Sequence, residues 1–191
     1  MVFSCFAACG KDKEPDEKPA ETLKVGFIFL HDEQSTYDKN FMDAAKERGC
    51  NQFILFSNSP LVQYTKNGKG YAPTDNEANL REDCYEAYAD YLVDVTEHLM
   101  DKGFNIPYIS PINEPQGDWN TPRQEGSPWR NSEIARMTRA LDASLNRSSK
   151  FDDVRIFIPG TTRPQPSFTT PRIVSFPTEI SAFSTLLFAS W

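Results

Sequence analysis

Apolar segments alternate with amphipathic helices along the middle of this chain. Residues 53–56 form a continuous apolar run, which is typical of a strand buried on both faces of a sheet. Similar strands are predicted at 108–112 and 154–158, and the segments between them have the periodicity of helices. Strands and crossover helices in series form βα units. The sequence therefore predicts an α/β fold with a parallel sheet.

Local signals predict where the helices lie. A first helix is expected over 38–48, and a long one over 80–101 because Asn79 and Glu82 have capping-box spacing. Asn131 is expected to cap a third helix. Apolar residues recur at helical intervals in the long helix, which indicates one buried face. They are Cys84, Ala87, Tyr88, Tyr91, Leu92, Val95 and Leu99.

Charge and cysteine spacing exclude several classes of function. The chain has 20 basic and 27 acidic residues and a net charge of −7, so we expect no nucleic acid partner. The four cysteines lack the paired spacing of metal ligands, and neither a metal nor a cofactor is predicted. Cys50 and Cys84 are expected as buried thiols rather than a disulfide. No segment is long enough to span a membrane as a helix.

The first 24 residues differ in composition from the middle of the chain. A short apolar run at 2–8 leads to Cys9, and a charged stretch follows. This pattern resembles a lipoprotein signal with a polar tether, in which Cys9 would carry a lipid anchor. It predicts an exported protein at the cell surface, in the periplasm or outside the cell. The other interpretation is a disordered leader.

The composition changes again from residue 160 to residue 191. Four prolines interrupt this segment, and Glu179 is its only acidic residue. Prolines break strands and helices into short pieces. We therefore expect an irregular tail, and the hypothesis is that it is foreign or frame-shifted. Ordered packing of Ile173 and Phe176 against the core would contradict that hypothesis.

Polar residues follow two of the predicted strands. Asn58 comes just after the first, and Asn113 and Glu114 come directly after the second. Active sites of βα barrels are built at such strand ends. Cleavage of a glycosidic bond needs a carboxylic acid beside the leaving oxygen and a second carboxylate across the anomeric carbon. Glu114 is therefore predicted as the acid, and Asn113 as a donor to a sugar hydroxyl. The alternative for Glu114 is a solvated loop carboxylate.

Two tryptophans, Trp119 and Trp129, lie in a polar stretch that follows Glu114. Such rings either stack on sugars or belong to the core. The alternative function is therefore a non-catalytic carbohydrate-binding module that uses both rings. A third hypothesis is a chain that does not fold stably, because an open partial barrel exposes strand edges.

Four segments resemble glycoside hydrolase family 30, in particular its endo-β-1,6-galactanase-like branch. They read FSNSP, TKNG, YISPINEPQ and QEGSP, in the family's order, and the likeness covers roughly residues 38–159. The resemblance implies a retaining O-glycosidase with a (β/α)8 TIM barrel and an attached β-sandwich, acting on β-linked polysaccharide. It implies Glu114 as the acid/base and Asn113 as a sugar ligand. Asn58, Trp119 and Glu125 are expected to border the cleft as substrate-binding residues.

The chain departs from the family pattern in two respects. Gly117 stands where the family commonly has an aromatic residue. The nucleophilic glutamate belongs after strand seven, whereas the pattern is lost here after strand five. A complete barrel takes about 250 residues. Residues 25–159 are therefore predicted as a partial TIM barrel of about strands 3 to 5, and the chain as an inactive fragment without its nucleophile.

Overall fold

The computed structural model describes residues 25–29, 36–72, 77–120, 125–158 and 172–175. Five parallel strands form one sheet, and their order follows the sequence. The strands are β1 Val25–Phe29, β2 Gln52–Phe56, β3 Tyr108–Ser110, β4 Arg155–Ile158 and β5 Ile173–Ser175. The α-helices are α1 Thr36–Glu47, α2 Tyr85–Asp101 and α3 Asn131–Leu145, and 3-10 turns occur at Val62–Tyr64, Glu82–Cys84 and Ser149–Phe151. The predicted α/β class with a parallel sheet is confirmed.

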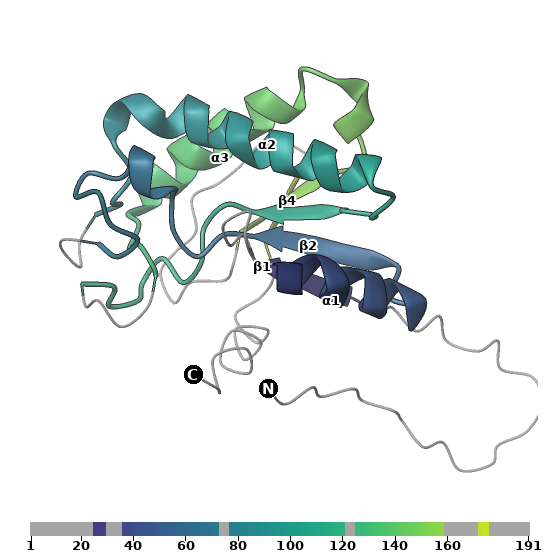
Figure 1. Ribbon diagram of the computed structural model, residues 1–191. Coiled ribbons are helices and arrows are strands. Elements are labelled where there is room, and N and C mark those ends of the chain that lie inside the picture. Colours follow the sequence, from purple (N-terminus) through teal and green to yellow (C-terminus); the bar gives the residue numbers. More distant parts are fainter. Residues whose placement is uncertain (1–24, 30–35, 73–76, 121–124, 159–171, 176–191) are drawn as a thin grey trace, which may run out of the picture.

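The hydrophobic core lies between the helices and one face of the sheet. Helices α2 and α3 lie side by side along that face (Figure 1). In β2, Phe53 and Leu55 are buried in the core, whereas Ile54 and Phe56 are only partly buried. Burial alternates in the same way along β4. The prediction that β2 is buried on both faces is therefore wrong, because the helices cover only the face that carries Phe53 and Leu55.

Helix α2 buries a wider face than the sequence indicates. Tyr88 and Leu92 are fully buried as predicted, but Ala87 is exposed. Tyr85, Ala89 and Val93 are buried instead, because α2 packs against both the sheet and α3. The buried residues of α3 are Ile134, Met137, Thr138, Leu141, Ser144 and Leu145.

The predicted capping box at the start of the long helix does not form. The α-helix begins at Tyr85, after the 3-10 turn Glu82–Cys84. The side chain of Asn79 is buried in the preceding loop, where its amide group donates to three oxygen atoms. These are Asn67 Oδ1 at 2.8 Å, Lys69 O at 3.1 Å and Tyr71 O at 3.0 Å. Contacts within the loop therefore displace the local capping interaction.

Helix α3 begins at Asn131, but a different residue satisfies its first turn. The carboxylate of Glu133 accepts the Arg130 N–H at 2.7 Å, which is the backbone half of a capping box. The same carboxylate accepts the Ala78 N–H at 3.1 Å. Glu133 thus caps α3 and connects this helix to the loop that precedes α2.

β5 lies in the tail that the sequence predicted as irregular, and β1 lies in the predicted barrel region at a place where no strand was predicted. β1 pairs with β2 at one side of the sheet, and β5 pairs with β4 at the other. Ile173 packs against the core, and Arg172 forms a salt bridge with Asp142 at 3.4 Å. Residues 173–175 therefore form a regular strand, and the packing of Ile173 counts against a foreign tail. The origin of residues 160–191 stays a hypothesis. Phe176 and residues 1–24, with Cys9, lie outside the described residues.

The two described cysteines, Cys50 and Cys84, are free thiols, as predicted. Cys84 is 4% exposed, whereas Cys50 is only partly buried. Burial raises the pKa of the Cys84 thiol. Within the described part of the chain, no helix combines the length and apolar character needed to cross a bilayer.

Candidate active site

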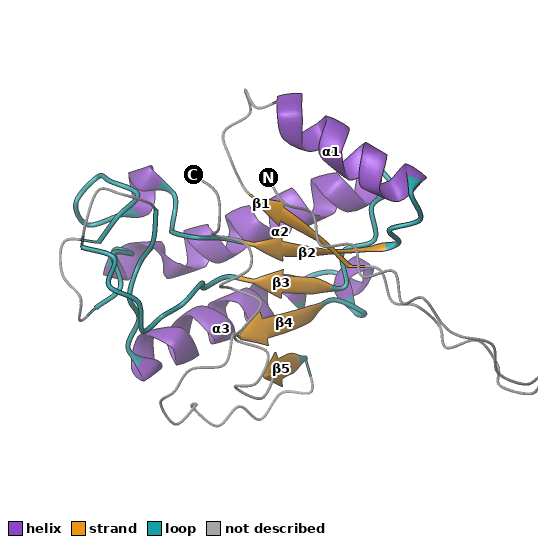
Figure 2. Ribbon diagram, turned by 90° about the horizontal axis from the view of Figure 1, so that it is seen from below, coloured by secondary structure: helices purple, strands orange, loops and turns teal. Residues whose placement is uncertain are grey.

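The candidate site lies at the carboxyl edge of the sheet, where the strand arrows of Figure 2 lead into long loops. One loop connects β2 to α2, and the other connects β3 to α3. The two loops are hydrogen bonded to each other: Gly126 N–H donates to Gly70 O at 2.9 Å, and Ala72 N–H donates to Trp119 O at 3.0 Å. Loops that are far apart in the sequence therefore form one unit.

Buried polar groups hold the strand ends beneath these loops. Ser57 N–H donates to Ser110 O at 3.1 Å, which continues the pairing of β2 with β3. The hydroxyl of Tyr88, on α2, donates to Ser57 Oγ at 2.8 Å. Burial raises the pKa of Tyr88, so its phenol remains a hydrogen-bond donor at neutral pH. These contacts connect the helix layer to the site.

Two of the predicted site residues are in direct contact. Asn113 Nδ2 donates to Asn58 Oδ1 at 3.2 Å, although the residues are 55 positions apart. Asn113 is 3% exposed, whereas Asn58 is only partly buried. The parallel pairing of β2 and β3 accounts for this contact, because it brings the residues after both strands to the same edge.

Glu114 follows Asn113 with a left-handed backbone conformation, φ = +38°, the only positive φ outside glycine among the described residues. Such a conformation costs a residue with a side chain about 1–3 kcal/mol. Its side chain is partly exposed. Within the described part of the chain, its carboxylate has no hydrogen bond or salt bridge.

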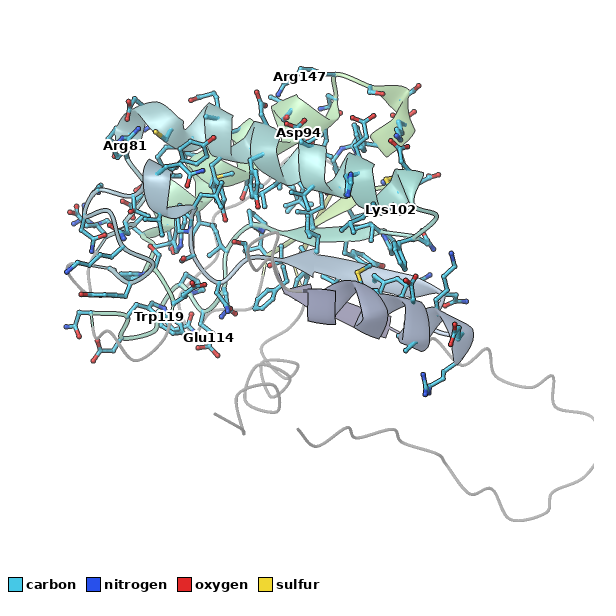
Figure 3. All side chains as sticks on the ribbon, in the orientation of Figure 1. Arg81, Asp94, Lys102, Glu114, Trp119 and Arg147 are labelled. Atoms are coloured by element: carbon cyan, nitrogen blue, oxygen red, sulfur yellow. The ribbon has the colours of Figure 1, made fainter. Side chains whose placement is uncertain are left out.

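Trp119 lies beside Glu114 (Figure 3), and its indole N–H donates to Glu114 O at 2.9 Å. Trp119 is 5% exposed and Trp129 is 4% exposed. Trp129 belongs to the core, where its ring meets Tyr85 edge to face with centroids 6.3 Å apart. Neither ring offers an open face for a sugar, which argues against a module that binds through both of them.

Glu125 lies farther along the second loop and is exposed. Its side chain lies against Gly70, since a Cβ added there would be 3.1 Å from Glu125 Cγ. Among the described residues, no hydrogen bond or salt bridge joins Glu125 to Glu114. In that same part of the chain, no three His, Cys, Asp or Glu side chains gather in a way that could hold a metal ion.

Sequence reasoning missed two residues that build this site. Asn79 was assigned to a helix cap, whereas its amide holds the first loop and its backbone N–H donates to Ser127 Oγ at 2.9 Å. Gly126 lies against Trp119 so closely that a Cβ there would overlap the ring. Only the conspicuous Asn and Gly content of these loops marked them as structured turns.

The five strands are parallel and in sequential order, and Glu114 follows β3. The model of O-glycosyl hydrolase family 30 matches residues 29–161. The chain therefore belongs to O-glycosyl hydrolase family 30, and the family predicted from its sequence is confirmed.

Related proteins show how much of the family's length this chain spans. The endo-beta-1,6-galactanase of Hypocrea rufa is 30% identical over 109 residues, which are 55% of this chain and 22% of that protein. The crystal structure of a conserved exported protein from Bacteroides fragilis aligns with a TM-score of 0.61 and 35% identity, over 64% of this chain and 25% of the other.

A third relative supports the fold alone. It is the family 30 subfamily 8 xylanase Xyn30A of Clostridium acetobutylicum, with a TM-score of 0.52 and 22% identity, over 71% of this chain and 35% of that one. The chain thus spans about a quarter of the length of the galactanase and of the Bacteroides fragilis protein.

Proposed function

We propose that this chain carries the acid/base half of a retaining glycoside hydrolase site, with Glu114 as the acid/base. The observation that carries the proposal is the placement of Glu114 at the carboxyl end of β3, with a partly exposed side chain whose carboxylate has no partner among the described residues. Asn58 and Asn113 form a hydrogen-bonded pair beside it. Membership of family 30 supports the same chemistry.

In the proposed reaction, the Glu114 carboxyl group gives its proton to the glycosidic oxygen as the bond from C1 to that oxygen breaks. A second carboxylate attacks C1 and forms a glycosyl-enzyme intermediate. Glu114, now ionised, then takes a proton from the water that hydrolyses this intermediate. Of the pair beside it, Asn58 is the more exposed and is suited to donate to a sugar hydroxyl.

The proposed architecture is part of a (β/α)8 barrel. Five parallel strands in sequential order suit a singly wound barrel, whereas doubly wound sheets reverse their strand order. The partly buried Ile54 and Phe56 would then face the barrel interior. A retaining site also needs a nucleophilic carboxylate, and no residue of this chain matches that position of the family pattern. The 191 residues by themselves are therefore expected to hydrolyse glycosides negligibly.

The proposed substrate is a β-linked polysaccharide, with β-1,6-galactan favoured by the likeness to the Hypocrea rufa enzyme. The test is hydrolysis of β-1,6-galactan, xylan and an aryl β-glycoside by the full chain and by Glu114→Gln. The Gln side chain keeps the shape of Glu but cannot supply the proton. Glu86→Gln, on an exposed face of α2, is the matched control. Neither chain is expected to cleave these substrates measurably. Cleavage by the wild-type chain would contradict its proposed inactivity, and cleavage that survives Glu114→Gln would also contradict the role of Glu114.

The proposed location is outside the cytoplasm, with a lipid on Cys9. The proposal depends on the apolar run before Cys9 and on the likeness to an exported protein. Metabolic labelling with a tagged fatty acid in a bacterial host tests it. The label should appear on the wild-type chain and be absent from Cys9→Ser.

A further inference from the structure

Glu114 has a backbone conformation that its own side chain disfavours. Its φ of +38° lies in the left-handed region, which suits glycine better than a residue with a Cβ. Neighbouring groups must therefore hold this peptide in place. The direction of the Glu114 side chain depends on them, because the backbone angles set where the Cβ points.

Two donors converge on the carbonyl oxygen of Glu114. Gly117 N–H donates at 2.9 Å, which closes a turn, and Trp119 Nε1–H donates at 2.9 Å. The indole is the only side-chain donor to this oxygen within the described residues. The next residue is also restrained, since Pro115 has a fixed φ and its carbonyl accepts Trp129 N–H at 2.9 Å.

The Trp119 ring is itself held in a narrow slot between two glycines. A Cβ at Gly117 would lie 2.6 Å from Trp119 Nε1, and a Cβ at Gly126 would overlap the six-membered ring. An aromatic side chain at position 117 and this position of Trp119 therefore exclude each other. The glycine that departs from the family pattern leaves room for the indole.

We propose that Trp119 is a positioning residue that orients Glu114 through its carbonyl oxygen, rather than a surface on which sugars stack. This inference rests on the proposed function, because the orientation matters to catalysis only if Glu114 is the acid/base. The indole N–H holds the left-handed peptide, and Gly117 and Gly126 hold the indole. Trp119 and Gly126, which follow Glu114 by 5 and 12 positions, thereby set the direction of its carboxylate.

The test is NMR on the full, isotope-labelled chain. The backbone 13C′ shift of Glu114 is read by an HN(CA)CO experiment, because Pro115 has no amide proton to report it. Trp119→Phe keeps a ring but removes the donor, so the 13C′ resonance should move upfield. Trp129→Phe makes the same change in the core and should leave it in place. Equal 13C′ shifts in Trp119→Phe and wild type, or equal displacements in both variants, would overturn the proposal.

A second measurement uses the wild-type chain and does not depend on a variant that folds. Replacing the proton of the Trp119 indole N–H by deuterium should shift the Glu114 13C′ resonance. In the protonated chain, that indole proton should exchange slowly with solvent. Absence of that isotope shift would also overturn the proposal. If the hydrolysis assay showed that Glu114 is not the acid/base, these NMR results would be unchanged. The acid/base role of Glu114 and the hydrogen bond from Trp119 can therefore fail separately.

Discussion

The helix layer and the loops at the carboxyl edge of the sheet are stabilised by different interactions. In the helix layer, apolar side chains of α2 and α3 pack against β2 and β4 in one continuous cluster of buried residues. In the loops, polar contacts through Asn79 and Trp119 join separate chain segments. The difference implies that changes in the helix layer alter stability, whereas changes in the loops alter the geometry of the site.

The largest loss of stability is expected for Leu92→Ala. Leu92 is fully buried between α2 and the sheet, so truncation leaves a cavity and should cost about 2–5 kcal/mol. Urea unfolding measured by circular dichroism checks the value. The Glu114 resonances should stay close to those of the wild type. A loss below about 0.5 kcal/mol would show that this layer is not packed as described.

A smaller loss of stability, with a larger effect on the site, is expected for Gly126→Ala. The added methyl group overlaps the Trp119 ring, and overpacking of this kind costs about 1–3 kcal/mol. The indole should leave its slot, which the Trp119 indole 1H–15N resonance reports directly. Gly70→Ala is the control, because it adds a methyl group to the neighbouring loop without a positive φ. That methyl group would meet only the flexible, exposed side chain of Glu125. An unmoved indole resonance in Gly126→Ala would contradict the slot.

Asn79→Ala should loosen the first loop and leave the helix layer intact. The change removes three hydrogen bonds from a buried amide, at a cost of about 1–3 kcal/mol. Lys69 O loses this donor, whereas Asn67 Oδ1 and Tyr71 O each keep another one. Hydrogen exchange should speed up at residues 66–72 and stay slow in α2. If both regions lose protection together, the loop and the helix layer are not separate in stability.

The smallest effect at neutral pH is expected for Tyr85→Phe. The Tyr85 hydroxyl is buried without a hydrogen-bond partner among the described residues, so its removal breaks no hydrogen bond there and should raise stability by about 1 kcal/mol or less. Burial, with the charge of Glu133, raises the pKa of Tyr85 in the folded chain. The unfolded chain then ionises first as the pH rises, and stability falls above the usual tyrosine pKa of 10.0.

Tyr85→Phe should therefore be less sensitive to alkali than the wild type. The difference should grow above pH 10, by up to about 1.4 kcal/mol for each pH unit. Urea midpoints at pH 7 and pH 11 for both chains measure it. Parallel losses in the two chains would show that Tyr85 is not the group responsible.

The sequence predicted the helix layer well and the loops poorly. The periodic positions of Tyr88 and Leu92 indicated the core, because burial of an amphipathic helix repeats every turn. The sheet edges were missed, since β1 and β5 are short and become strands through pairing with β2 and β4. The role of Asn79 could not be predicted either. An Asn side chain can cap a helix or bond to a neighbouring loop, and the local sequence does not distinguish the two.

For the candidate site, the sequence by itself determined which residues lie at the strand ends. Asn58, Asn113 and Glu114 follow apolar runs, and parallel strands bring their carboxyl ends to one edge. Only the tertiary structure decided how those residues are held. The left-handed peptide of Glu114, its bond to Trp119 and the slot between two glycines depend on contacts across loops, and no local pattern in the sequence encodes such distances.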